Sequence, residues 1–225
     1  MNSIMPIRFG QKPRDVSRYA TPSEGNGNPY LRLYETQPEG LAFPWLFVHH
    51  ENARGAVHVV PVVTDKKGRQ FVHMLVMQRF PMGDCLSIEL PAGLWGDHDE
   101  NETPLEAAPR ELKEETGYKA KKSVMLSQQP YATSTGMTTE EKSFVLTFTK
   151  QKPGKTHRDE DEVQMIQGSL NVPLAVFMDP AGFERWVAKR MAKKFPQKEY
   201  IIGMDTPAAR GLMPRLKKGR LDISG

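Results

Sequence analysis

Hydrophobic residues cluster in runs of strand length along the first two thirds of the chain. The strongest run covers residues 56–63, and a second covers residues 71–77, with a polar, glycine-containing turn at residues 65–68 between them. Two apolar runs around such a turn predict an antiparallel pair of strands. Shorter runs at residues 45–48 and 143–149 also predict strands, the latter by its alternation of apolar and polar positions.

A helix is predicted over residues 104–116. Thr103 is a suitable N-cap, and Pro104 suits the first helical position because the amide that proline lacks has no partner there. Glu106 completes a capping box, and Gly117 is placed to end the helix in a left-handed conformation. Pro109 is expected to kink the first turns. The apolar positions fall on one face, at Leu105, Ala108 and Leu112.

Further helices are predicted from residues 179–180 and, shorter, from residues 206–207, where prolines follow capping residues. The pattern gives the first of them an inner side made of Phe183, Trp186, Val187, Arg190 and Met191. An acidic loop at residues 159–162 is expected to precede a short apolar strand at residues 163–166. Strands, a helix, strands and then helices indicate an α+β fold rather than a parallel sheet.

Composition restricts the class of protein. The 225 residues contain 31 lysines and arginines, 27 aspartates and glutamates, and one cysteine, Cys85. No apolar run approaches the ~18 residues of a membrane span, no secretory signal is evident, and one cysteine suits a reducing compartment. We therefore expect a soluble cytoplasmic protein. Residues 184–225 contain 11 basic and 4 acidic residues, which indicates either a solvated helical face or a contact with nucleic acid or a phosphate-bearing ligand.

Three carboxylates crowd one side of the helix at residues 104–116. Glu111, Glu114 and Glu115 lie within about 100° of arc. Like charges at this spacing destabilise a helix, whereas Mg²⁺ is bound in proteins by a few carboxylates together with substrate phosphates. The stripe predicts either a magnesium site or an ordinary solvated acidic face.

The residues around the helix favour the magnesium site over the solvated acidic face. Gly96, Glu102 and residues 110–118 (RELKEETGY) match every fixed position of G-x5-E-x7-R-E-U-x-E-E-x-G-U, where U is bulky and apolar. The chain thus resembles the Nudix hydrolases. The resemblance implies a Nudix-type α/β/α sandwich with a mixed sheet, in which a loop–helix–loop binds Mg²⁺, or Mn²⁺, against a pyrophosphate. It assigns the metal to Glu111 and Glu115, then Glu114 and the Ala92 carbonyl, and structural roles to Gly96, Glu102, Arg110 and Gly117.

A second resemblance is to the ADP-ribose pyrophosphatase branch. Residues 89–93 (ELPAG) and the strand end at residues 77–80 (MQRF) are similar to segments that flank the site there. The resemblance implies that Arg79 contacts the phosphates or the terminal ribose, and that Glu89 bonds the adenine or supports the site. The chain departs from that branch in three places: Gln78 and Arg79 lack a spacer residue, Gly93 precedes Gly96 by three residues, and Thr135 stands where proline is usual.

Two downstream segments complete the resemblance. Residues 135–140 (TGMTTE) are similar to a substrate-binding loop of the branch, which implies roles for Gly136 and Glu140. The acidic residues 159–162 are similar to a mobile loop that supplies the catalytic glutamate, either Glu162 or Glu160. Members of the branch are homodimers joined through an amino-terminal strand region, and residues 30–55 are apolar enough for that role.

The sequence therefore predicts three regions: an amino-terminal arm and short-strand region (1–55), a Nudix hydrolase domain (56–180) and a basic carboxy-terminal helical extension (181–225). The predicted reaction is Mg²⁺-dependent hydrolysis of a nucleoside diphosphate sugar, with ADP-ribose giving AMP and ribose 5-phosphate. The rival hypotheses are another sugar nucleotide such as GDP-mannose, a Nudix-fold sensor that binds without cleaving, and an RNA-end hydrolase. No membrane partner is expected.

Overall fold

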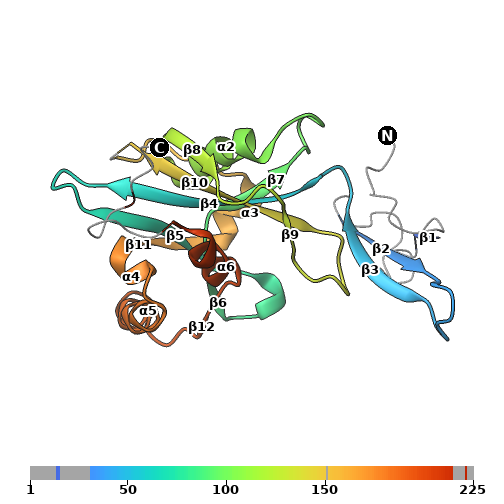
Figure 1. Cartoon of the computed structure of the whole chain (residues 1–225). Coiled ribbons are helices and arrows are strands. Elements are labelled where there is room, and N and C mark those ends of the chain that lie inside the picture. Colours follow the sequence, from blue (N-terminus) through green and yellow to red (C-terminus); the bar gives the residue numbers. More distant parts are fainter. Residues whose placement is uncertain (1–13, 16–30, 151, 215–220, 222–225) are drawn as a thin grey trace. The chain divides into compact units, whose positions relative to one another are not determined.

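The computed structural model describes residues 14–15, 31–150, 152–214 and 221 (Figure 1). They fall into two compact units. The first takes in the described residues up to Ala56, together with Leu94–Thr103 and Gln129–Ser143. The second takes in Val57–Gly93, Pro104–Gln128 and the described residues from Phe144 onward. None of the described helices is both long enough and apolar enough to cross a membrane.

The first unit is built on a small antiparallel sheet in the order β1 (Arg14–Asp15), β2 (Leu31–Thr36) and β3 (Trp45–His50). The loop that carries Gly136 runs along β3. Val48 donates its amide to the Met137 carbonyl at 2.8 Å, and the indole of Trp45 donates to the Gly136 carbonyl at 2.8 Å. β9 (Tyr131–Ala132) pairs with the first residues of β10 (Glu141–Thr149).

The second unit is organised around a mixed sheet in the order β12-β6-β5-β4-β10-β8, with β11 also paired to β5 and β7 to β4. Neighbouring strands are antiparallel in most pairs, but β12 runs parallel to β6. The bounds of these strands are β4 (Gly55–Thr64), β5 (Gln70–Gln78), β6 (Leu86–Glu89), β7 (Ala92–Trp95), β8 (Ala120–Met125), β11 (Ile166–Pro173) and β12 (Tyr200–Ile202). A short 3-10 turn, η1 (Phe80–Met82), follows β5.

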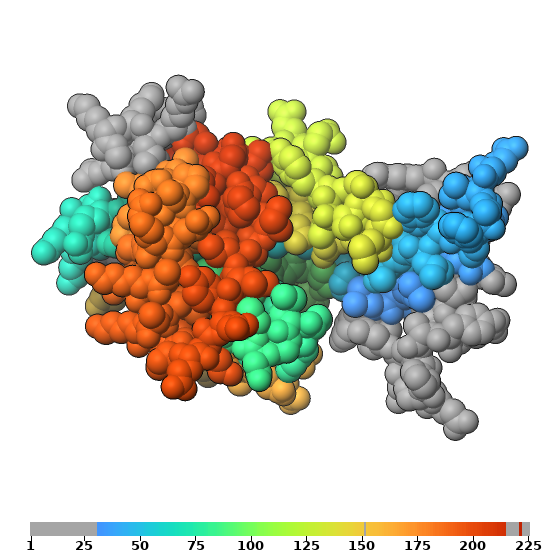
Figure 2. Space-filling view, turned by 90° about the horizontal axis from the view of Figure 1, so that it is seen from below, coloured from blue at the N-terminus to red at the C-terminus, as the bar shows by residue number. Residues whose placement is uncertain are grey.

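Helices cover both faces of this sheet, which explains why β4 and β5 are buried almost throughout (Figure 1). α2 (Pro104–Thr116) packs on one face, and α4 (Leu174–Phe177), α5 (Pro180–Lys194) and α6 (Asp205–Leu212) lie on the other. Figure 2 shows α5 in orange and α6 in red side by side on the latter face. The central core joins that face of the strands to these helices through residues such as Val60, Met74, Ile88, Phe183 and Met191.

The α+β class and the mixed sheet agree with the sequence analysis, and the predicted helix has the observed bounds. Gly117 ends it with φ of +74° and donates its amide to the Lys113 carbonyl. The helix continues through Pro109. The strands predicted at residues 45–48, 56–63, 71–77 and 143–149 lie within β3, β4, β5 and β10, and the later helices correspond to α5 and α6.

Two local predictions are wrong. The acidic residues 159–162 were expected to form a loop and residues 163–166 a strand, but Glu160–Met165 is a helix, α3, and β11 begins only at Ile166. Asp159 caps that helix in a reciprocal box with Glu162, which gives the short segment a local reason to be helical. Arg190 is exposed rather than on the inner side of α5, because a long charged side chain keeps its head group in water, and its guanidinium lies over the ring of Trp186.

Candidate active site

Two of the three predicted carboxylates are buried. Glu111 is 7% and Glu115 2% exposed, while Glu114 is half-buried. Burial raises the pKa of Glu111 to about 7, although Arg110 opposes the shift. Burial also raises the pKa of Glu115 well above its usual range, and the nearby charges of Glu162 and Glu111 raise it further. The helix therefore places two carboxyl groups inside the protein, where their ionised forms are costly.

The segment that follows β6 lies against these carboxylates. The amide of Ala92 donates to Oε2 of Glu115 at 3.0 Å. A Cβ atom on Gly93 would overlap all three carboxyl atoms of Glu111, so only glycine lets the backbone come so close. The structure thus places the predicted ligands Ala92, Glu111 and Glu115 side by side.

Arg110 balances part of the negative charge. Its Nη1 donates to Oε1 of Glu111 at 2.6 Å and lies 3.5 Å from Oε2 of Glu114. Arg110 and the Ala92 amide hold the carboxylates. Among the described residues, no three acidic, histidine or cysteine side chains are grouped closely enough to bind one metal ion. The donor set nevertheless suits a hard divalent cation, since carboxylate and carbonyl oxygens are its preferred ligands.

Arg79 and Glu89 form an ion pair at the ends of β5 and β6. Nη2 of Arg79 lies 2.5 Å from Oε2 of Glu89, and Nε donates to Oε1 at 3.1 Å. These bonds raise the pKa of Arg79, and the charges of Glu115 and Asp205 contribute to the shift. Both residues, predicted to contact substrate, therefore lie in the same unit as the carboxylates, and each is the other's partner.

The chain between β10 and α3 runs along the carboxyl end of α2. The Nε of Arg158 donates to the Glu115 carbonyl at 2.8 Å, and the His157 amide donates to the Glu114 carbonyl at 2.9 Å. Sequence reasoning missed Arg158. In the sequence Arg158 stands immediately before the acidic residues 159–162, and this position does not indicate that it contacts the Glu115 carbonyl.

The two candidate general bases differ in their surroundings. Glu162 is half-buried, burial raises its pKa, and its charge acts on both Glu111 and Glu115. Its Oε2 accepts the amide of Asp159 at 2.9 Å. Glu160 is exposed. Proximity to the buried carboxylates thus favours Glu162.

Four of the predicted residues belong to the first unit. The Gly96 amide donates to Oε2 of Glu102 at 3.2 Å, and Gly96 has φ of +78°, which supports the structural roles predicted for the pair. Gly136 is half-buried, and its carbonyl accepts a hydrogen bond from the indole of Trp45.

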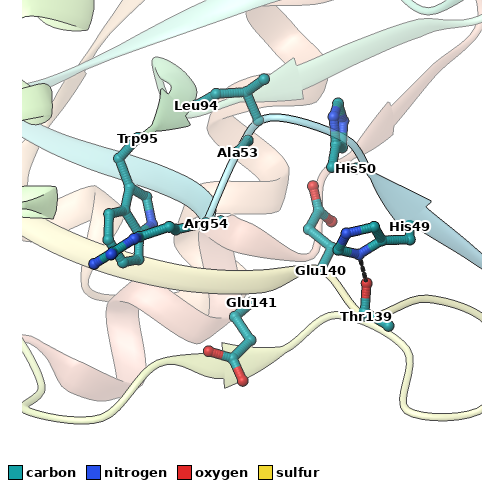
Figure 3. Close-up of a pocket in the computed structure, with 10 residues that line it drawn as sticks. His49, His50, Ala53, Arg54, Leu94, Trp95, Thr139, Glu140 and Glu141 are labelled. Atoms are coloured by element: carbon teal, nitrogen blue, oxygen red, sulfur yellow. Dashed lines mark hydrogen bonds between the residues drawn. The ribbon is translucent and has the colours of Figure 1, made fainter. Parts of the chain in front are cut away.

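Glu140 lines a cavity of about 210 Å³ in the first unit (Figure 3). Figure 3 shows His49 hydrogen-bonded to Thr139 beside it, and the two atoms are 2.6 Å apart. Leu94 and Trp95, which belong to the insertion between Gly93 and Gly96, form part of the wall. Both residues belong to β7, and the Trp95 carbonyl accepts the Arg54 amide at 3.0 Å.

Comparison with known proteins assigns the family. A model of the NUDIX domain matches residues 53–194, and the chain belongs to the Nudix family. It is 32% identical over 133 residues to the "Putative nudix hydrolase 2" of Caenorhabditis elegans, covering 57% of this chain and 56% of that protein. It is 37% identical over 102 residues to the mouse (Mus musculus) "ADP-sugar pyrophosphatase", covering 43% of this chain and 44% of that one.

The chain therefore spans about half the length of the curated relatives it matches. A solved structure described as "Crystal structure of ADP compounds hydrolase" is 17% identical, with a TM-score of 0.49 over 83% of this chain and 97% of its own.

Proposed function

We propose that this protein hydrolyses the pyrophosphate bond of a nucleoside diphosphate sugar in the presence of Mg²⁺, and that ADP-ribose is cleaved to AMP and ribose 5-phosphate. The observation that carries the proposal is the burial of Glu111 and Glu115 against Ala92 and Gly93 inside a complete Nudix motif. The similarity to a protein named ADP-sugar pyrophosphatase supports the substrate class.

In this proposal Glu111, Glu115, Glu114 and the Ala92 carbonyl bind the metal, and Mn²⁺ is an alternative to Mg²⁺. A divalent ion held by these residues would neutralise charge on the diphosphate and lower the pKa of bound water. Gly93 keeps the backbone close to the Glu111 carboxylate. Arg110 orients Glu111, and Arg158 fixes the end of the helix through the Glu115 carbonyl.

Glu162 is the proposed general base, with Glu160 the alternative. A base works best when its pKa lies near the working pH, and burial moves the pKa of Glu162 in that direction. Arg79 is proposed to bind the phosphates or terminal ribose, with Glu89 holding its guanidinium in place. Gly136 and Glu140 are proposed to contact the substrate from the first unit.

The test is a hydrolysis screen with Mg²⁺ over ADP-ribose, other nucleoside diphosphate sugars including GDP-mannose, and capped RNA. We expect release of AMP from ADP-ribose and a loss of about 100-fold or more in Glu115→Gln. Glu162→Gln and Glu160→Gln form a matched pair, and we expect only the first to reduce kcat strongly. Full turnover in Glu115→Gln would refute the proposed mechanism.

The same screen separates the rival functions. Preferential cleavage of another sugar nucleotide would change the substrate and keep the mechanism. No turnover of any substrate, with ADP-ribose still raising the melting temperature, would make the protein a nucleotide sensor. Cleavage of capped RNA with steeply salt-dependent binding would support the nucleic-acid alternative.

We also propose that the protein is a homodimer joined through residues 31–50. Phe43 is 75% and Leu46 52% exposed, and large exposed apolar side chains of this kind favour burial in an interface. Light scattering is expected to give the mass of a dimer, reduced to that of a monomer by the double variant Phe43→Ser, Leu46→Ser. Val163→Ser, which alters a side chain of the second unit with an exposed fraction between those of Phe43 and Leu46, is the control. A monomeric mass for the unaltered protein would refute the proposal.

A further inference from the structure

The backbone from Leu90 to Ala92 is held by a contact at every residue. The Pro91 carbonyl accepts the Val59 amide at 2.8 Å, and the Ala92 amide donates to Glu115 at 3.0 Å. At Leu90 the amide donates to Oδ2 of Asp205 at 2.7 Å, in a buried bond between residues 115 positions apart. The first two contacts come from the sheet and from α2. The third comes from the carboxy-terminal part of the chain.

Asp205 reaches Leu90 because β12 adds to the edge of the sheet beside β6. Ile202 pairs with Ile88, and the Gly203 amide then donates to the Ile88 carbonyl at 2.9 Å. A Cβ atom on Gly203 would meet Oδ1 of Asp205 at 2.5 Å and Cγ of Glu89 at 3.0 Å, so a glycine is needed for the chain to turn so closely into α6. The parallel pairing sets the register, and the turn delivers the first residue of α6 to the end of β6.

The bond is made at a cost to stability. Asp205 is only 5% exposed, and its Oδ1 has no hydrogen-bond partner among the described residues. The nearest cationic candidate is His58, whose Nδ1 lies 3.5 Å from Oδ2. A buried carboxylate with one oxygen unpaired is unfavourable for folding, and such groups often serve a function. In Asp205 the hydrogen-bonded oxygen, Oδ2, holds the amide of Leu90, which lies two positions before Ala92.

We propose that Asp205 is a positioning residue for the reaction: by accepting the Leu90 amide it fixes the backbone through Pro91 to Ala92, and so fixes the Ala92 carbonyl with respect to Glu115. The catalytic consequence rests on the proposed reaction and the effect on metal affinity rests on the proposed metal site, whereas the effect on backbone order rests on neither. The carboxy-terminal extension thereby contributes a residue that acts on the site through Leu90.

The experiment compares Asp205→Ala and Asp205→Glu with Asp205→Asn, which keeps an acceptor oxygen at the same reach. Thr206→Val is the control, because Thr206 is the next residue, is fully buried, and has a hydroxyl with no partner among the described residues. Three quantities are measured in the full chain: hydrogen exchange of the Leu90 amide by NMR, the affinity for Mn²⁺ alone, and kcat and KM for ADP-ribose.

We expect Asp205→Ala to accelerate exchange at Leu90 and to weaken Mn²⁺ binding by about 10-fold or more, the usual effect of losing a group that orients a ligand. The loss is expected in kcat more than in KM, and Asp205→Asn is expected to restore all three readouts. Asp205→Glu keeps the charge but displaces the acceptor, and we expect it to resemble Asp205→Ala. If Asp205→Ala does not fold, Asp205→Glu provides the same test.

Unchanged Leu90 exchange and Mn²⁺ affinity in the alanine and glutamate variants would overturn the inference. So would equal losses in Thr206→Val, since the effect would then be general loosening of α6. If no substrate is turned over by the unaltered protein but Mn²⁺ affinity still follows the Leu90 bond, the positioning role stands and the proposed function fails.

Discussion

The close approach of Gly93 to Glu111 makes the substitution Gly93→Ala a sharp test of the site. A Cβ atom there would occupy the position of the Glu111 carboxyl group. Because the carboxyl group is the free end of a flexible side chain, it can retreat without moving the backbone. Non-bonded carbon atoms do not approach much closer than 3 Å, so the retreat is about 1 Å, a displacement that costs on the order of 100-fold in rate at a reaction centre.

The assay is Mg²⁺-dependent release of AMP from ADP-ribose, with thermal unfolding measured in parallel. We expect kcat of Gly93→Ala to fall about 100-fold while the protein stays folded. Gly211→Ala is the matched control, because nothing lies within 4 Å of a Cβ at that exposed position of α6. Because Gly211→Ala is also a change from glycine to alanine, we expect that variant to keep its activity. Near-normal activity of Gly93→Ala would refute the argument that the Glu111 carboxylate acts from its observed position.

Two further predictions concern stability. Burial lowers the pKa of His73, which is 6% exposed. The folded state therefore binds fewer protons than the unfolded state, and stability is lost as pH falls below about 6.5, by at most ~1.4 kcal/mol per pH unit. The stability of the unaltered protein relative to His73→Gln should thus decrease from pH 7.5 to pH 5.5 in urea unfolding, and a constant difference would contradict this. Gly117→Ala should cost at least about 1–2 kcal/mol, because Gly117 has φ of +74° and a Cβ there would strike the Gly154 carbonyl. Gly211→Ala is again the control, and equal stability of the two variants would be the contrary result.

Local signals explain which parts of the fold were predictable. The bounds of α2 follow from residues adjacent to its ends, and β4 and β5 follow from uninterrupted apolar runs. The helix α3 was missed even though its Asp159-x-x-Glu162 spacing is a capping box, because four neighbouring acids were interpreted by their charge and not by their spacing. A short helix with acids at its start is in fact favoured by the helix dipole.

The candidate site likewise contains residues that the sequence predicts and residues that it does not. The carboxylates lie in a motif that is continuous in sequence, Gly93 lies three residues before that motif begins, and the structure brings them together. Arg158 and Asp205 do not belong to it: the first contacts a backbone carbonyl 43 residues away and the second an amide 115 residues away. A bond to the backbone places no demand on the identity of the residue it reaches. No pattern of side chains in one sequence therefore reveals such a pair.

The energetics of α2 explain why the site needs these distant contacts. Raising the pKa of Glu111 from 4.5 to about 7 corresponds to a penalty on the order of 3 kcal/mol for keeping it ionised. Full burial of Leu112 on the same helix contributes a favourable term of similar size, roughly 1.5–3 kcal/mol. The penalty for burying ionised Glu111 and the gain from burying Leu112 are therefore similar in size, and together they add little to the stability of the helix. Their geometry is held instead by Arg110, the Ala92 amide and Arg158, and a substitution that releases one of these contacts should disturb the site before it unfolds the domain.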